Sequence, residues 1–221
     1  MMRERLTRIV VCLLPALLVM ASTGLAAEVR GTVSASGSLS KKPSRYVTRG
    51  AATEAPSTDG GSAMVAVALE SLDHPTPLIV PDTPFVMAQE NTAFVPDLMV
   101  VPVGATVTFP NRDAFFHNVF SYSPPRNFDL GRYPKGETRT VTFEMSGIVR
   151  LFCEIHASMF ASIAVVNTNR SQIVPAGSEF VFTDVEPGRY RLLAIDARGR
   201  RGAQEITVGE QSARAIAMTL E

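Results

Sequence analysis

The sequence has little of several residue types that define common protein classes. It contains no tryptophan, two cysteines and three histidines, and aromatic residues make up only 7% of its 221 positions. Basic and acidic residues balance at 21 each, so there is no positive excess with which to hold nucleic acid by bulk electrostatics. Beyond the N-terminus no apolar run is long enough to span a membrane, yet 46% of the residues are hydrophobic. We therefore expect one or two domains with a buried core.

The first 27 residues have the pattern of a secretory signal peptide. Three arginines precede the apolar stretch IVVCLLPALLVM, and ASTGLAA supplies small residues for cleavage after Ala26 or Ala27. A membrane anchor is the alternative, but the apolar stretch is shorter than the roughly 20 residues of a transmembrane helix. We expect an exported protein, in the bacterial periplasm, that is not inserted in the membrane after cleavage.

Cleavage of residues 1–27 leaves a single cysteine. Cys12 would be removed with the signal peptide, and Cys153 would remain alone. Exported proteins usually pair their cysteines. An unpaired thiol in that compartment is a liability unless it is buried or occupied. This favours a ligand role for Cys153.

The apolar pattern along the chain is that of strands. Almost no segment has a 3.6-residue apolar stripe, whereas short β-rich runs such as VRGTVSAS and ASIAVVNT stand between Gly, Pro, Asn and Asp residues. This spacing predicts an all-β protein, built as two β-sandwiches.

The segment LFCEIHASMF contains most of the candidate metal ligands. It contains Cys153, His156 and Met159 in a Cys-x2-His-x2-Met pattern, and His117 opens an earlier strand in FFHNVF. A thiolate, two imidazoles and a thioether together suit copper, and two His and one Cys with a weak axial Met form the blue-copper arrangement. A structural zinc site would have another Cys or His in place of the thioether. His74 lies in a proline-bounded turn and is set aside.

Other interpretations of these residues remain open. A buried thiol and a core methionine are ordinary features of a β-sandwich. A catalytic Cys–His pair, as in a hydrolase, would need an orienting residue and an oxyanion element, and neither is visible. Multicopper enzymes need further histidines, and only His74 is left, so we expect no enzyme. Copper delivery without electron transfer is a further alternative, although delivery proteins often have methionine-rich tracts and the methionines here are scattered.

At this point the sequence resembles the cupredoxins, the plastocyanin–amicyanin family. The segments that carry the resemblance are AFVPDLMVVPVGATVTFPNRD, HNV and CEIHASM, and the last has the short ligand loop of amicyanin. Their order is similar to that in plastocyanin-like domains of exported bacterial proteins of the methylamine-utilisation group. The resemblance covers roughly residues 80–166. It implies a Greek-key cupredoxin sandwich that binds one type 1 copper through His117, Cys153, His156 and the axial Met159.

The resemblance also implies the surroundings of the site and its use as a one-electron carrier. Asn111 and Asn118 would support the ligand loops. Glu154 stands beside the thiolate, in a loop that lacks the proline found next to the ligand histidine in amicyanins. A redox partner such as a periplasmic cytochrome or dehydrogenase would dock near His156, on an apolar surface formed by Phe115, Phe116, Ala157 and Phe160.

The rest of the chain resembles a second module. The C-terminal GSEFVFTDVEPGRYRLLAID and the N-terminal VRGTVSASG and AMVAVALES are similar to the carboxypeptidase regulatory-like (transthyretin-related) sandwich. We hypothesise that residues 28–72 and 167–221 form one discontinuous sandwich into which a cupredoxin domain, residues 76–166, is inserted. Alternatively, the N-terminal strands are the first hairpin of the cupredoxin sheet.

Overall fold

The computed structural model describes residues 27–35, 64–75, 77–209 and 214–220. Every regular element in these ranges is a β-strand, which confirms the predicted all-β class. No helix suitable for crossing a membrane is found in the described part of the chain. Apart from Ala27, the predicted signal peptide lies outside the described residues.

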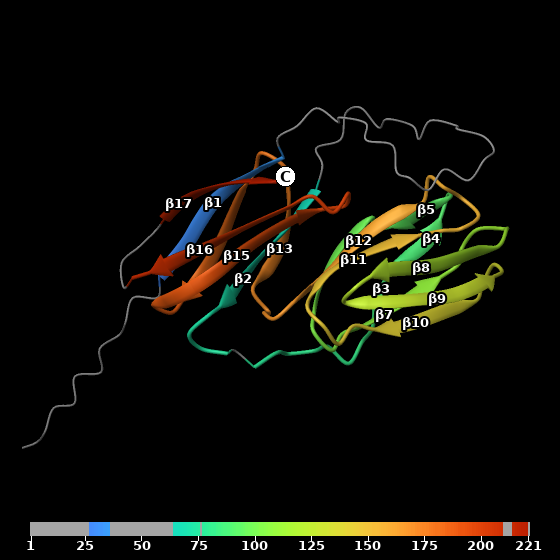
Figure 1. Ribbon diagram of the computed structural model, residues 1–221, viewed down its shortest axis with the longest axis horizontal. Helices are drawn as coiled ribbons and strands as arrows, with labels where there is room; N and C mark the ends of the chain where they lie inside the picture. The colour runs from blue at the N-terminus through green and yellow to red at the C-terminus, as the bar shows by residue number, and fades with distance from the viewer. Residues whose placement is uncertain (1–26, 36–63, 76, 210–213, 221) are drawn as a thin grey trace, which may run out of the picture.

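Strands β3 to β12 form the sandwich that carries the predicted ligands (Figure 1). Its larger sheet has the order β6-β12-β11-β8-β9, its smaller sheet has the order β10-β7-β3, and β4 and β5 form a separate hairpin. β12 runs parallel to β6 and β7 runs parallel to β3, so connections cross between the sheets, as expected for the predicted Greek-key sandwich. The bounds are β3 Phe85–Val86, β4 Ala88–Glu90, β5 Ala93–Val95, β6 Leu98–Pro102, β7 Thr106–Pro110, β8 His117–Ser123, β9 Arg126–Tyr133, β10 Thr138–Thr142, β11 Gly147–Phe152 and β12 Phe160–Val166.

The burial of these strands follows from their sequence. In β7, Val107 and Phe109 are buried while Thr106 and Thr108, which alternate with them, are half-exposed, as expected for a strand with one face in the core. β12 reads FASIAVV and is buried along almost its whole length. A continuous apolar run of this kind indicates that both faces of the strand are covered.

The remaining strands form two further sheets, drawn beside the first sandwich in Figure 1. Their orders are β14-β1-β17 and β13-β2-β15-β16. β1 and β2 therefore pair with strands from the end of the chain. The boundaries of the two domains, and the family of this second sandwich, stay predictions. The bounds are β1 Ala27–Ala35, β2 Met64–Ser71, β13 Ser171–Pro175, β14 Glu179–Val185, β15 Gly188–Asp196, β16 Arg201–Val208 and β17 Arg214–Leu220.

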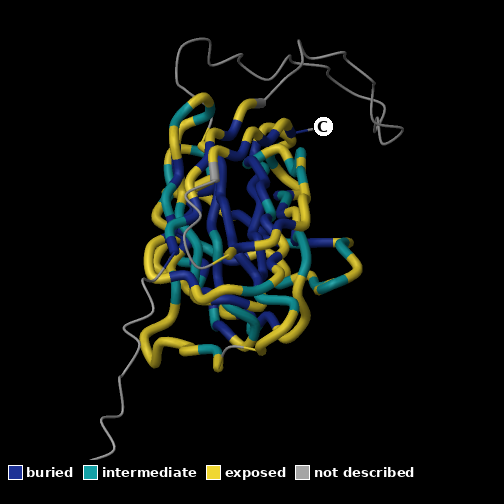
Figure 2. Tube along the Cα trace, turned by 90° about the vertical axis from the view of Figure 1, so that its left-hand side faces the viewer, coloured by how far each residue is buried: buried dark blue, intermediate teal, exposed yellow. Residues whose placement is uncertain are grey.

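The two sandwiches meet through the outer faces of β2 and β15 on one side and of β6 and β12 on the other. Figure 2 shows the buried residues gathered between the layers, with exposed residues along the edges and turns. The buried cluster at this junction consists of Ala66, Ala68, Leu98, Ala164, Val166 and Ile195.

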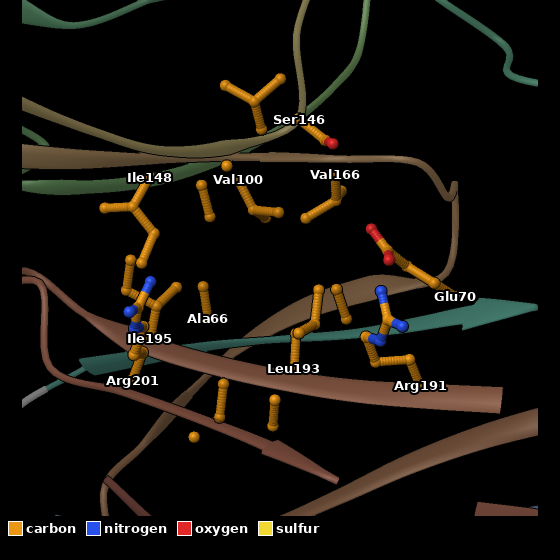
Figure 3. A pocket seen from close by; sticks show the side chains of 17 residues that line it. Ala66, Glu70, Val100, Ser146, Ile148, Val166, Arg191, Leu193, Ile195 and Arg201 are labelled. Carbon is orange, nitrogen blue, oxygen red and sulfur yellow. The ribbon is translucent and has the colours of Figure 1, made fainter. Parts of the chain in front are cut away.

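Small side chains leave this junction incompletely filled. Packed sheets lie about 10 Å apart, a gap that facing alanines do not bridge. A cavity of about 310 Å³ remains, with Ala66, Ala68 and Ala164 among its lining residues. Figure 3 shows Arg201 at one end of it and Glu70 at the other.

Candidate metal centre

Two neighbouring strands of the larger sheet bring the predicted ligands together. His117 is the first residue of β8, and Cys153 directly follows the last residue of β11. The strands are adjacent and pair antiparallel at Phe120 and Phe152, so the start of β8 lies beside the end of β11. His156 belongs to the turn that leads from β11 into β12.

Three atoms of the predicted ligand residues, which could hold a metal ion, form a compact triangle. The Nδ1 atoms of His117 and His156 are 3.0 Å apart. The Sγ atom of Cys153 lies 3.8 Å from Nδ1 of His117 and 3.9 Å from Nδ1 of His156. His117 is fully buried, Cys153 is 4% exposed, and the ring of His156 reaches the surface.

The size of this triangle fits a single metal ion. In protein zinc sites, which serve here as a scale, the metal lies about 2.0–2.1 Å from a histidine nitrogen and about 2.3 Å from a cysteine sulfur. At bond angles of about 110–120°, these lengths place two nitrogens about 3.3–3.6 Å apart and a nitrogen and a sulfur about 3.6–3.8 Å apart. The two nitrogen–sulfur distances, 3.8 and 3.9 Å, lie at or just above the upper end of that range, and the nitrogen–nitrogen distance of 3.0 Å is somewhat shorter than its range. Two imidazoles and one thiolate in a plane match the equatorial ligands that copper takes in blue-copper sites.

Met159 follows His156 by three residues and is buried in the core next to the turn. It is 1% exposed and belongs to the same core cluster as Cys153. Its backbone N–H donates to the carbonyl oxygen of His156 at 3.0 Å, which closes the turn between them. Its role as a fourth, axial ligand stays a prediction.

The two predicted asparagines hold the loops around the ligands. The side-chain oxygen of Asn118 accepts the backbone N–H of Glu154 at 2.7 Å, which ties β8 to the residue after Cys153. Asn111 is buried and donates to the carbonyl oxygens of Phe115 and Tyr133 at 2.9 and 3.0 Å. Both asparagines thus stabilise backbone that carries a predicted ligand.

Glu154 meets the site through its backbone and not through its carboxylate. The side chain is 61% exposed and accepts from the guanidinium of Arg132 at 3.1 Å. A carboxylate in this position is surrounded by solvent, so its charge is screened from the ligand triangle.

Asp113 was not among the sequence-predicted site residues, although it lies in the segment TFPNRD. Its Oδ2 is 2.8 Å from Nε2 of His117, on the side of the ring away from Cys153. Its carboxylate also accepts the backbone N–H groups of Asn91 and Thr92 at 2.8 and 2.9 Å. Burial alone would raise the pKa of Asp113, but the hydrogen bonds from Thr92, His117 and Asn91 outweigh it and lower the pKa, so the carboxylate is ionised at neutral pH.

An apolar residue, Phe115, packs beside His156, and further apolar residues near the predicted ligands in sequence are exposed. The ring of Phe115 lies 5.1 Å from the ring of His117 and 5.4 Å from that of His156, measured between centroids. Phe116 is also exposed, and so is Ile155, which sequence reasoning had not assigned to this surface. Of the other predicted docking residues, Ala157 is exposed and Phe160 is half-buried.

The pKa of His156 depends on its surroundings. Burial lowers the pKa of His156, and the adjacent His117 lowers it further, while Asp113 acts in the opposite direction. His156 is therefore neutral at neutral pH, with a lone pair available for a metal. His74, by contrast, is exposed in a turn in which its backbone N–H donates to Ser71 Oγ at 3.0 Å.

Comparison with known proteins finds likeness among solved structures. No protein-family model matches the chain, and no curated protein matches it. The Cu-containing nitrite reductase (NirK) from Thermus scotoductus SA-01 is 26% identical over 43% of this chain and 26% of its own, with a TM-score of 0.37. A purple cupredoxin from Nitrosopumilus maritimus is 21% identical over 37% of this chain and 99% of its own, with a TM-score of 0.34.

The Cu(I) form of the M51A mutant of amicyanin is a third similar structure. It is 23% identical over 45% of this chain and 99% of its own, with a TM-score of 0.37. This chain thus spans about a quarter of the nitrite reductase and nearly all of the two smaller proteins. The assignment of a metal centre rests on the distances between the side chains of this chain itself.

Proposed function

We propose that this chain is an exported mononuclear type 1 copper protein that carries one electron at a time and is not an enzyme. The observation that supports this function most is the triangle of two Nδ1 atoms and one Sγ, with edges of 3.0 to 3.9 Å and only His156 reaching the surface. Copper bound there would alternate between Cu(I) and Cu(II), states that accept this mixture of soft and imidazole ligands.

The chain's own contribution would be a rigid and largely dry site. His117, Cys153 and Met159 are buried, so the protein keeps water away from three of the four proposed ligands. The Asn118–Glu154 hydrogen bond and the turn closed by Met159 fix the loop that presents Cys153 and His156. Ligands held in this way change position little between oxidation states, which favours fast electron transfer.

The exposed edge of His156 would be the point of contact with a redox partner. Phe115 packs beside His156, and the apolar residues Phe116, Ile155 and Ala157, neighbours of the predicted ligands in sequence, are exposed. A periplasmic cytochrome or dehydrogenase would be such a partner. Membership of the methylamine-utilisation group is a proposal about ancestry and assigns no pathway.

The spectrum of the copper-loaded protein tests this function. Purified protein with Cu(II) should show an intense visible thiolate-to-copper band, and Cys153→Ser should lose it. His74→Ala is the matched control, because this histidine lies outside the triangle, and it should keep the band. An unchanged band in Cys153→Ser would refute the assignment.

Voltammetry separates electron transfer from copper delivery, the alternative function. A fixed redox site should give a reversible one-electron couple and retain Cu(I) in the presence of a competing chelator. A colourless complex that releases Cu(I) readily would instead support delivery.

We also propose that residues 76–166 form a copper-binding domain inserted into a discontinuous sandwich of residues 28–72 and 167–221, with the second sandwich acting as a scaffold. The pairing of β1 and β2 with strands β13 to β17 supports this division. Expression of residues 76–168 alone tests it, because an autonomous domain should fold and bind copper. An unfolded, copper-free product would contradict the proposal.

A further inference from the structure

Two carboxylates lie next to the ligand triangle, and they differ in burial and in partner. The side chain of Asp113 is 11% exposed and contacts a ligand histidine directly. The side chain of Glu154 is 61% exposed and pairs with Arg132. A charge in a buried site acts on its neighbours with much less screening than one in water. Of the two carboxylates, Asp113 therefore has the stronger electrostatic effect on the metal centre.

Asp113 is held in place by a turn that comes from elsewhere in the fold. Asn91 and Thr92 connect β4 and β5, and their backbone N–H groups both donate to its carboxylate. These residues have φ values of 55° and 57°, a conformation that is uncommon for a β-branched residue such as Thr92. The N–H of Asp113 donates in turn to Oδ1 of Asn111 at 2.9 Å. Because both of its oxygens accept hydrogen bonds, the carboxylate is held in one orientation.

This fixed carboxylate determines the state of His117. An ionised carboxylate only accepts, so Nε2 of His117 carries the proton and donates it to Asp113 at 2.8 Å. A ring that carries its single proton on Nε2 has its lone pair on Nδ1, the atom that faces Cys153 and His156. Hydrogen bonds of this type fix the tautomer and orientation of a metal-bound histidine and raise its basicity.

We propose that Asp113 is the positioning residue of the metal centre and that its charge, and not that of Glu154, favours Cu(II) over Cu(I). This inference rests on the proposed copper function. A negative charge that is hydrogen-bonded to a ligand histidine attracts the more highly charged ion, Cu(II), more strongly than Cu(I). The reduction potential is therefore lower with Asp113 than it would be with a neutral residue.

Substitution of each carboxylate by its amide tests the charge. Asp113→Asn and Glu154→Gln both remove one negative charge with little change of shape. We expect Asp113→Asn to shift the Cu(II)/Cu(I) affinity ratio at least tenfold towards Cu(I), which is about 59 mV for one electron. Glu154→Gln should leave the potential nearly unchanged. Equal shifts in the two variants would overturn the role of Asp113.

Nitrogen-15 NMR of the metal-free protein tests the positioning without any copper. The wild-type His117 should show a single tautomer, protonated at Nε2, and Asp113→Asn should keep it because the amide oxygen still accepts. Asp113→Ala should give a mixture of tautomers and a Cu(II) affinity 10–100-fold lower, the usual cost of losing such a partner. A wild-type His117 protonated at Nδ1 would overturn the positioning role.

Different results would overturn the copper function and the charge effect of Asp113. A wild-type protein without a visible band or a reversible couple overturns the copper function. A wild-type protein with both, whose potential does not respond to Asp113→Asn, overturns only the charge effect.

Discussion

The hydrogen bond from Asn118 to the ligand loop can be tested by a single substitution. Asn118 is 1% exposed, and its Oδ1 accepts the N–H of Glu154 at 2.7 Å. Its Nδ2 contact with Asp129 is longer, at 3.5 Å, and contributes less. Asn118→Ala therefore removes one strong acceptor and leaves the N–H of Glu154 without its partner. Such a loss costs about 1–3 kcal/mol of the free energy of unfolding.

Urea unfolding of the metal-free protein, followed by far-UV circular dichroism, measures this cost. The urea concentration at the unfolding midpoint should fall, while the slope of the free energy of unfolding against urea concentration stays the same, as expected for a change in stability alone. Asn169→Ala is the matched control, because this exposed side chain also bonds backbone groups, at Ile79 and Pro77. Water can replace those bonds, so we expect a loss within about 0.5 kcal/mol. Equal losses in the two variants would show that the Asn118 bond does not stabilise the loop.

Three further predictions concern packing and pH. Ala164→Val adds two methyl groups to the wall of the cavity between the sandwiches and should raise the free energy of unfolding by about 0.5–2 kcal/mol in the same urea assay, whereas a lower value would mean that the space is not available. Gly31→Ala should destabilise by about 1–3 kcal/mol, because its Cβ would lie 2.5 Å from the carbonyl oxygen of Ile216 and from the ring of Phe180, and an unchanged melting temperature would contradict this close packing. The metal-free protein should lose stability as the pH falls below about 6.5, the ordinary pKa of histidine, because His156 binds a proton in the unfolded chain but not in the folded one; this loss ends once the pH is below the lowered pKa of folded His156. His156→Ala should remove that part of the pH dependence, and the same slope in both proteins would refute the explanation.

The strands and the ligand triangle could largely be predicted from local sequence. Period-2 burial, as in β7, and continuous apolar runs, as in β12, depend on a few neighbouring residues. Cys153 and His156 are three positions apart, so one turn brings them together whatever the rest of the fold does. His117 could be added because its strand opens directly after a polar turn, at the level where the other strand ends.

The cavity between the sandwiches could not be predicted in this way. Ala66, Ala68 and Ala164 are ordinary strand residues in the sequence, and each alone is compatible with a filled core. Their effect appears only because β2 and β12 belong to different sandwiches that meet face to face. A pairing of surfaces nearly a hundred residues apart in the chain leaves no local pattern.

The two carboxylates illustrate the same limit at the site. Glu154 seemed relevant because it follows Cys153, yet successive side chains of an extended chain point to opposite sides. A residue next to a buried ligand is thus expected to face outward, and Glu154 does so, towards Arg132. Asp113 is four residues from His117, and its orientation depends on N–H groups of Asn91 and Thr92 in a hairpin that is distant in sequence. Proximity in the chain therefore pointed to the screened charge, and only the fold reveals the less exposed one that contacts His117.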